Sequence, residues 1–584
     1  MGKEGKWSRD DLMKKVFVSY LFISIMSTLA AMLGMLVDGI VIGQFLGQEC
    51  VSAFGFASPV FILIAAIAGM FSNGGSSVCS SHIGRGENDK VRLNFTVTCL
   101  VSLIIGVAIT VFCIAAAEPL AGFLGARGDL VPLTADYLRG IGAGGAFIML
   151  SQVLLVYVRV DNDPILGFVS IIVMTAVNIV LDVLFGVVLK WGLIGMGLAT
   201  SISYAAAFVV CLRHFFRKTN ILKLARISGG ASEIREVIMC GAPSALNRVC
   251  MTIRGIALNY LLLSIGGSVA VSALTVQNNI NQFLSSVTMG VGMTIMLIAS
   301  IFYGERDGAA LRKTLRVSLK TGLTLSIIIT VLVFIFAQQL VGLFLSGSPE
   351  AMTLAVRSFR MFCLSLPFSL VCVALLYFYQ STRNLFMANF ICIVHGLAFV
   401  LAYAFGLSAA FGTDGVWISF LCAEVTAVAS VFIVAGIRNK RLPKGAGDIT
   451  LLPKDFEPAA ERILDITIKN KMSDVMQVSE RIGKFCERFT SDTDKINRVA
   501  LCIEEMAGNV VQHAFRDGKK HYIDIKIIME EKDIIFRLRD DGTAFNPLTA
   551  EVEDGQYGIA VVRKLAKELS YSSVAGMNNT MIKI

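Results

Sequence analysis

The sequence predicts an all-α polytopic membrane protein followed by a C-terminal α/β domain of two layers. Of the 584 residues, 55% are hydrophobic and only 16% are charged, and the mean hydropathy is +0.70. Soluble globular chains carry about 25% charged residues. Residues 450–584 hold 20 of the 52 basic and 22 of the 43 acidic residues. This composition excludes a soluble enzyme, a disordered chain and a disulfide-rich secreted protein. The uneven distribution of charge suggests that residues 1–449 and residues 450–584 lie in different solvents.

Twelve membrane spans are expected between residues 16 and 437, because each needs about 20 mostly apolar residues. The charge-free run 255–304 is too long for one span and is expected to turn near Gly266 and Gly267. The other charge-free runs are 16–37, 50–84, 93–117, 140–158, 164–181, 191–212, 321–349, 361–382, 384–413 and 415–437, and the count of twelve includes the span around 237–263.

Basic residues in alternate loops predict the orientation in the membrane. They precede span 1, follow span 12 and fill the loops between spans 2 and 3, 6 and 7, and 8 and 9, whereas the opposite loops hold little beyond Arg127 and Lys190. Basic loops stay on the cytoplasmic side. We therefore expect a multi-pass protein of the cell membrane, with both termini and the C-terminal domain in the cytoplasm. The net charge of +9 gives no reason to expect nucleic-acid binding.

An internal repeat with a fixed offset of 220 residues divides the apolar region. Matching pairs include Val51 and Val271, Gly84 and Gly304, Arg92 and Arg312, Tyr157 and Tyr377, and Gly195 and Gly415. Six helices followed by the same six form a parallel repeat, whose halves enclose a substrate site near the bilayer midplane in transporters. We expect an N-lobe of residues 1–219 and a C-lobe of residues 220–437.

Ordered motifs occur in the first half of this region. They are DGIVIGQFLG at 38–47, Pro59, Gly74-Gly75, GRG at 84–86, RVDNDP at 159–164, NIVLD at 178–182 and GLIG at 192–195. In this order, and with the repeat, residues 12–437 resemble the multidrug and toxic compound extrusion (MATE) family. The resemblance implies a cation-coupled antiporter that exports small amphipathic or cationic organic compounds in exchange for protons or sodium ions.

Two carboxylates lie inside predicted spans. Asp38 ends the charge-free stretch of span 1, and Asp182 lies deep in span 5, one helical turn after Asn178. Buried carboxylates are costly in a membrane and mark functional sites by default. They suit proton exchange or a dehydrated sodium ion; the alternative is a structural pair satisfied by hydrogen bonds. The MATE resemblance assigns a cation or proton site to Asp38, Asn178 and Asp182, with the hydroxyl of Thr200.

The second half departs from one branch of that family, which uses acidic residues in spans 7 and 8. Span 7 carries Arg248 and Arg254 instead, as candidates for pairing with a carboxylate or binding an anionic substrate or lipid, unless Arg248 reaches toward the membrane surface. Glu424 in span 12 is a candidate substrate or proton contact. His395 in span 11 is expected to be a satisfied core residue.

The composition changes after residue 437. Residues 438–457 contain two prolines and two glycines and are expected to form a linker. Residues 458–584 carry the pattern of a soluble α/β domain. Strands are expected at 463–468, 522–529, 533–538, 570–574 and 580–584, and helices at 473–489, 493–515 and 558–569.

Four ordered motifs in this domain resemble the histidine-kinase-like ATPase fold, most like the anti-sigma-factor serine kinases. They are EMAGNVVQH at 505–513, DDGTAFNP after a strand at 540–547, GQYG at 555–558, and Asn579-Thr580 at the start of the last strand. The resemblance implies ATP and Mg²⁺ as cofactors. Its roles are a general base at Glu505, a Mg²⁺ ligand at Asn509, adenine contacts at Asp540, Gly542 and Thr580, and phosphate-facing backbone at Gly555 and Gly558.

Two absences from the sequence narrow the function. There is no GxxxxGK[ST] phosphate loop, which excludes an ATP-driven pump of that type. No helical phospho-acceptor histidine lies before the ATP-binding domain, which argues against an autophosphorylating histidine kinase. The ATP-binding module is therefore expected to regulate the transporter or to phosphorylate a partner, which the resemblance makes a small anti-sigma-antagonist-like protein. The alternatives are a membrane sensor that signals through the kinase-like domain, and a flippase for lipids or lipid-linked precursors.

Overall fold

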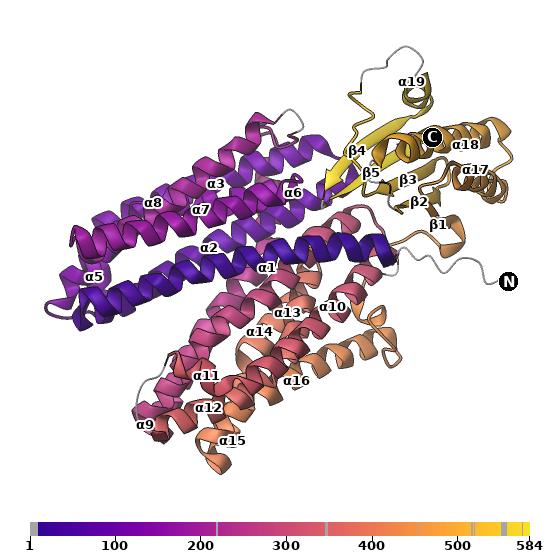
Figure 1. The fold of residues 1–584 in the computed structure, drawn as a ribbon. Helices are drawn as coiled ribbons and strands as arrows, with labels where there is room; N and C mark the ends of the chain where they lie inside the picture. Colours follow the sequence, from indigo (N-terminus) through magenta and orange to yellow (C-terminus); the bar gives the residue numbers. More distant parts are fainter. Residues whose placement is uncertain are drawn as a thin grey trace.

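The protein consists of two helical bundles and an α/β domain that lies across one end of both (Figure 1). The computed structural model describes residues 10–217, 220–344, 349–453, 455–515, 518, 520–550, 557–574 and 576–584. The first bundle contains α1 (Asp10–Val41), α2 (Gln48–Arg85), α3 (Asn88–Ala115), α4 (Ala117–Phe123), α5 (Leu130–Gly142), α6 (Gly145–Val160), α7 (Pro164–Asp182) and α8 (Leu193–Leu212). The second contains α9 (Gly230–Gly304), α10 (Gly308–Ile335), α11 (Ala337–Gly342), α12 (Pro349–Cys363), α13 (Leu366–Ser381), α14 (Leu385–Ile393), α15 (Phe399–Phe411) and α16 (Thr413–Asn439).

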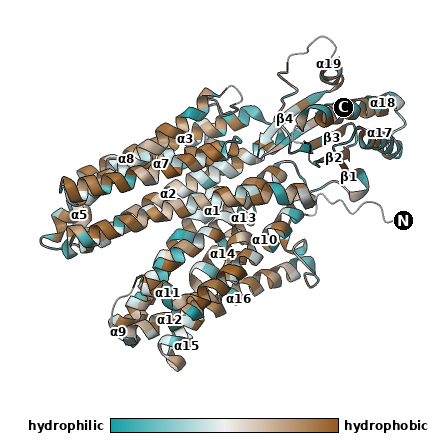
Figure 2. Ribbon diagram, viewed as in Figure 1, coloured by the Kyte–Doolittle hydropathy of each residue, from teal (hydrophilic) through white to brown (hydrophobic). Residues whose placement is uncertain are grey.

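Both bundles are built from membrane-length helices. In the described part of the chain, nine helices are long and apolar enough to span a membrane, and up to eleven spans result if α5 with α6 and α12 with α13, bent by 47° and 48°, each count as one. Hydrophobic residues follow these helices along both bundles (Figure 2). The 75-residue α9 counts once, although Gly267 interrupts it with a φ of 63°. The turn predicted near Gly266 and Gly267 is therefore present as a break inside one long element.

Glycines let the two bundles meet. A Cβ atom on Gly74 of α2 would lie 2.8 Å from the backbone nitrogen of Gly241, and one on Gly84 would lie 3.1 Å from that of Glu305. Only small residues allow two helix backbones to approach so closely. The bundles converge beside the C-terminal domain and diverge away from it (Figure 1).

The C-terminal domain is a two-layer structure. Its antiparallel sheet has the order β1-β2-β3-β5-β4, formed by β1 (Ile463–Lys469), β2 (Tyr522–Met529), β3 (Ile534–Asp540), β4 (Glu568–Val574) and β5 (Met577–Lys583). The helices are α17 (Met472–Cys486), α18 (Thr493–Asn509) and α19 (Tyr557–Leu565). Apolar residues at alternate strand positions, such as Phe536 and Leu538, pack with residues of these helices into one core.

Several predicted boundaries in this domain were wrong. The helix expected to run to residue 569 ends at Leu565, and the last strand begins at Met577, so that Thr580 lies in its middle. Asp540 is the last residue of β3 rather than the first after it. The reason is strand pairing, because Asp540 faces Asn578 across the β3–β5 ladder and extends both strands beyond their apolar alternation.

Four π-helices occur among the described residues, and three of them contain or directly follow a residue discussed in the sequence analysis. The segment η2 (Val183–Val188) follows Asp182, η4 (Val394–Ala398) contains His395 and η7 (Val510–Ala514) follows Asn509. The fourth, η1 (Ile42–Leu46), begins four residues after Asp38. Such widened turns occur frequently at functional sites.

Candidate functional site

Asp38, Asn178 and Asp182 come together inside the first bundle. Asp182 ends α7 and is fully buried, Asn178 lies one turn earlier, and Asp38 of α1 interacts with both. The packing of α1 against α7 brings these residues together, as the sequence predicts. Oδ1 of Asp38, both carboxylate oxygens of Asp182 and Nδ2 of Asn178 are nevertheless buried without a hydrogen bond of ordinary geometry.

This concentration of unsatisfied polar atoms is suited to holding a proton or a cation. A bound proton lets one carboxyl group donate to the other, and a hard cation takes oxygen ligands. Thr200 of α8 is also buried, but its hydroxyl donates to the carbonyl oxygen of Met196 at 3.2 Å. No hydrogen bond among the described residues joins Thr200 to the carboxylates of Asp38 and Asp182.

The other candidate membrane residues lie in the second bundle. The guanidinium of Arg254 lies 5.8 Å from the centre of the Phe420 ring, and no ion pair of Arg248 or Arg254 is found in the described part of the chain. Glu424 and His395 are both buried, with 2.7 Å between the Glu424 carboxylate and Nδ1 of His395. His395 is thus in the core, but its Nε2 has no partner, so the predicted full satisfaction of this residue was wrong.

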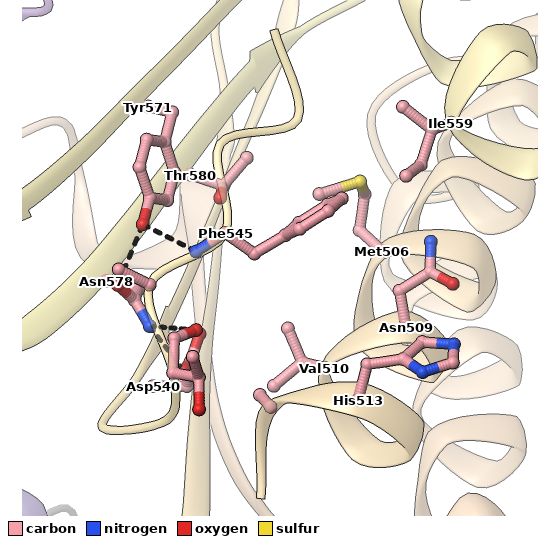
Figure 3. A pocket seen from close by; sticks show the side chains of 13 residues that line it. Met506, Asn509, Val510, His513, Asp540, Phe545, Ile559, Tyr571, Asn578 and Thr580 are labelled. Atoms are coloured by element: carbon pink, nitrogen blue, oxygen red, sulfur yellow. Dashed lines mark hydrogen bonds between the residues drawn. The ribbon is translucent and has the colours of Figure 1, made fainter. Parts of the chain in front are cut away.

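A cavity of about 370 Å³ lies in the C-terminal domain between the sheet and α18 (Figure 3). Asn509 reaches it from the helix side, and Asp540 and Thr580 reach it from β3 and β5, so three predicted nucleotide residues share one site. The complete lining is Met506, Asn509, Val510, His513, Ala514, Asp540, Thr543, Ala544, Phe545, Ile559, Tyr571, Asn578 and Thr580.

Asp540 has one carboxylate oxygen engaged by the protein. Its Oδ1 accepts the backbone N–H of Gly542 at 2.8 Å and Nδ2 of Asn578 at 2.9 Å. Burial raises the pKa of Asp540 to about 6, and these two hydrogen bonds oppose the increase. Both bonds end on Oδ1, which leaves Oδ2 for a donor that enters the cavity, such as the amino group of a purine.

Gly542, Gly558 and Glu505 are not among the residues that line the cavity. A Cβ atom on Gly542 would lie 2.5 Å from that of Ala514, so only glycine fits beside Asp540. A Cβ atom on Gly558 would collide with the carboxylate of Glu505, which packs against the start of α19. Gly555 lies outside the described residues.

Tyr571, Phe545 and Asn578 are lining residues to which the sequence analysis gave no role. The hydroxyl of Tyr571 donates to Oδ1 of Asn578 at 2.9 Å and accepts the backbone N–H of Phe545 at 3.0 Å. The ring of Phe545 projects between the sheet side and the helix side of the cavity (Figure 3). Asn578 directly precedes the Asn579-Thr580 motif and Phe545 lies inside the motif at 540–547, so the sequence offered a signal for both. Tyr571 carries no comparable signal.

Comparison with known proteins decides the family. The MatE family model matches residues 24–184 and 243–404, more than half of the chain. The chain belongs to this family. Residues 468–583 match the histidine kinase-like ATPase domain, so the protein joins a MATE transporter domain to an ATPase-type module, and such a module implies ATP binding.

Two relatives of known name align with about two thirds of the chain. The multidrug export protein MepA of Staphylococcus saprophyticus is 25% identical over 403 residues, which span 68% of this chain and 88% of MepA. MepA of Staphylococcus haemolyticus is 26% identical over the same shares of the two chains. The MATE protein is therefore similar to exporters over its bundles.

Solved structures support the same fold. A multidrug resistance MATE transporter in an outward-facing conformation superposes with a TM-score of 0.70 at 23% identity, covering 76% of this chain and all of that one. A mutant of the Vibrio cholerae MATE transporter VcmN gives a TM-score of 0.69 at 18% identity, covering 74% of this chain and 99% of VcmN. The MATE protein is thus a multi-pass membrane protein.

An ion-pair network joins the ATPase domain to the second bundle. Glu305 and Asp307, in the loop between α9 and α10, are 2% and 0% exposed. Arg539 pairs with both, at 3.0 Å from Asp307, and Lys526 lies 2.8 Å from Asp307. Arg537 donates to the backbone carbonyl of Glu305 at 2.7 Å. Burial alone would lower the pKa of the Arg539 guanidinium, but the two carboxylates raise it overall.

A second set of contacts joins the ATPase domain to the first bundle. Nδ2 of Asn162 donates to Oγ of Ser573 at 2.9 Å, and its Oδ1 accepts the backbone N–H of Gly576 at 3.0 Å. Lys15 of α1 lies 2.6 Å from Asp541, the residue after the adenine-site candidate Asp540. The domain therefore contacts both bundles at the end where they converge.

Proposed function

We propose that the protein is a cation-coupled antiporter that exports small amphipathic or cationic organic compounds. The observation that carries this proposal is the group of unsatisfied polar atoms of Asp38, Asn178 and Asp182 inside a MatE-family bundle. The named relatives, described as multidrug export proteins, support the direction and the substrate class. Protons or sodium ions would bind at the carboxylates of Asp38 and Asp182. The Thr200 hydroxyl, which donates to the carbonyl oxygen of Met196, is expected to contribute less to this site.

The membrane arrangement follows from the same proposal. Twelve spans result when the two arms of α9 are counted separately and each bent helix pair counts as one. The basic loops support a cytoplasmic position for the ATPase domain and both termini. The bundles then converge on the cytoplasmic side, which is the arrangement of an outward-facing transporter.

The C-terminal domain is proposed to bind Mg-ATP in the cavity beside Asp540. The amino group of adenine would donate to Oδ2 of Asp540, the Phe545 ring offers an apolar surface to the base, and Asn509 would supply an oxygen to the magnesium ion. Glu505 packs against Gly558 instead of lining the cavity. A serine-kinase reaction with Glu505 as general base therefore needs a rearrangement at the start of α19.

The contact between the two parts supports regulation of transport by nucleotide. Opening of the cytoplasmic side requires the two bundles to separate there, and the domain binds both through Arg539 and Asn162. Asp540 follows Arg539 directly, so a shift of β3 caused by nucleotide would alter the Arg539 ion pairs. Binding free energy can change a two-state equilibrium only by its difference between the states, and this strand offers such a difference.

Transport in proteoliposomes tests the proposal. Ethidium movement is measured under separate pH and sodium gradients, with Mg-ATP present or absent on the side of the C-terminal domain. Gradient-driven ethidium transport that is lost in Asp38→Asn and kept in Asp129→Asn is the expected result. Unchanged transport in Asp38→Asn would refute coupling through this site, and equal rates with and without ATP would refute the regulation.

A membrane sensor is the second candidate, because the same buried network would transmit a signal from the bundles to the ATP cavity. A sensor binds its ligand but does not move it. Ethidium-dependent changes in ATP affinity without ethidium transport would favour this function over the antiporter.

A further inference from the structure

A second polar cluster lies inside the bundle of α9 to α16. It consists of Cys372 on α13, His395 in η4 and Glu424 on α16, which come from three separate elements. All three side chains are buried, and their ligand atoms lie within 4.8 Å of one another. The widened turn of η4 is the local feature that places His395 in this cluster.

The internal repeat relates this cluster to the site of the first bundle. The offset of 220 residues aligns Cys372, His395 and Glu424 with Gln152, Thr175 and Tyr204. Thr175 lies beside Asn178, since a Cβ atom on Gly34 would contact both residues. The two halves therefore place different chemistry at related depths, with oxygen and amide groups in the first and a thiol, an imidazole and a carboxylate in the second.

We propose that Cys372, His395 and Glu424 bind a transition-metal ion of the zinc type. Thiolate, imidazole and carboxylate are the protein ligands of zinc, and three of them are the number found where one coordination position stays exchangeable. A hard ion such as sodium or magnesium would not use the thiol. Binding requires the thiol to lose its proton, and the thiolate and Glu424 then balance the two charges of the metal.

The surroundings agree with a ligand that is bound reversibly. Nε2 of His395 is buried without a partner, so the ring is not fixed by hydrogen bonds on both sides. Arg254 interacts electrostatically with Glu424, so a positive charge lies near this carboxylate.

A second group of metal-ligating residues, at the end of the bundles near the ATPase domain, provides a contrast. His82 lies close to Glu233 and Glu236. Both ring nitrogens of His82 already face carboxylates, at 2.8 Å from Glu87 and 3.1 Å from Glu233. This group contains no thiol, and its contacts are those of a satisfied hydrogen-bond network.

Cobalt binding to the full-length protein tests the proposal. The protein is purified in detergent through a tag without histidine, dialysed against a chelator, and titrated with cobalt(II) as a spectroscopic substitute for zinc. The expected result is one equivalent of cobalt with a thiolate-to-cobalt charge-transfer band, which zinc then removes by displacement. Absence of this band in the parent protein would overturn the proposal.

Matched variants connect the signal to the cluster. Cys372→Ser should abolish the charge-transfer band, whereas Cys363→Ser, a change at another buried thiol of the same bundle, should keep it. Glu424→Gln should weaken cobalt binding by more than about 100-fold, the upper range for losing an outer-shell partner. Mg-ATP binding to each variant serves as the check that the chain is folded. A band of equal strength in Cys372→Ser would mean adventitious binding elsewhere and would also overturn the proposal.

Discussion

Arg539 and Asp540 are consecutive residues of β3 that lie on opposite faces of the sheet. Asp540 lines the cavity proposed for nucleotide, and Arg539 pairs with Glu305 and Asp307 of the transporter. Successive side chains of a strand point to opposite faces. The same alternation occurs on β5, where Thr580 lines the cavity and Nδ2 of Asn579 donates to the Glu305 carboxylate. The cavity proposed for nucleotide and the contact with the transporter therefore lie on opposite faces of one sheet, and neighbouring residues of the same strand reach them.

Glu305→Gln is expected to release the ATPase domain from the second bundle. The substitution removes a buried charge that Arg539 and Arg537 share, and breaking such a pair costs about 3 to 5 kcal/mol. Hydrogen–deuterium exchange should increase in the α9–α10 loop, which the domain covers. Glu480→Gln, at an exposed pair with Lys484 on α17, is the control and should leave exchange in this loop unchanged.

Asp540→Asn is expected to weaken Mg-ATP binding by about 10-fold to 100-fold. This range corresponds to the loss of one hydrogen bond to a charged group, about 1.5 to 3 kcal/mol. Calorimetric titration of the full-length protein measures the change. Asp494→Asn, an exposed position near the start of α18, should bind as the parent does, and equal affinity of the Asp540 variant for Mg-ATP would contradict the assigned adenine contact.

The raised pKa of Asp540 predicts opposite pH effects on stability and on nucleotide binding. Its folded pKa of about 6 exceeds the unfolded value of about 3.9, so ionisation opposes folding. The stabilising contribution of Asp540 is therefore fully present below about pH 4, and it is lost as the pH rises through about 6. Mg-ATP affinity should rise over the same interval, because the purine amino group needs the carboxylate. Thermal unfolding and titration of the parent and Asp540→Asn, in which both trends should be smaller, provide the measurement.

Asp182→Asn and Thr200→Val are expected to differ in their effect on ethidium transport. Asp182 has two buried oxygens without hydrogen bonds, whereas the Thr200 hydroxyl already donates to Met196. The Asp182 variant should lose gradient-driven transport, and the Thr200 variant should keep most of it. Loss of transport in both variants to the same extent would place the Thr200 hydroxyl in the ion site itself.

Gly558→Ala should displace Glu505 and reduce Mg-ATP affinity, because the added Cβ atom meets the Glu505 carboxylate at the start of α19. Gly483→Ala is the matched control, since the nearest atom to its added Cβ lies at 3.9 Å. The control should also gain slightly in stability, because alanine favours the helix by about 1 kcal/mol over glycine. Titration and thermal unfolding of both variants check this pair of expectations.

Most of the fold and of the candidate nucleotide site could be predicted from local sequence patterns. Apolar runs of membrane length and the 220-residue repeat predict the bundles, since hydropathy is a property of each segment alone. The sequence brought Asn509, Asp540 and Thr580 forward because they lie in ordered motifs, and all three line one cavity. Phe545 lies inside the motif at 540–547 but received no role. Tyr571 was not predictable, because an aromatic residue in a strand is equally compatible with a core position.

The sequence by itself determined a MATE transporter region and an ATPase-type domain through their ordered motifs. It also determined the change between them near residue 450, because composition and periodicity change there. Only the tertiary structure decided how they meet. Arg537 and Arg539 read as the solvent face of an amphipathic strand, and Glu305 and Asp307 as ordinary loop residues. Their pairing joins positions more than two hundred residues apart, and the meeting of Cys372, His395 and Glu424 depends likewise on the packing of three helical elements. Such contacts follow from packed surfaces and complementary charge, which no local pattern records.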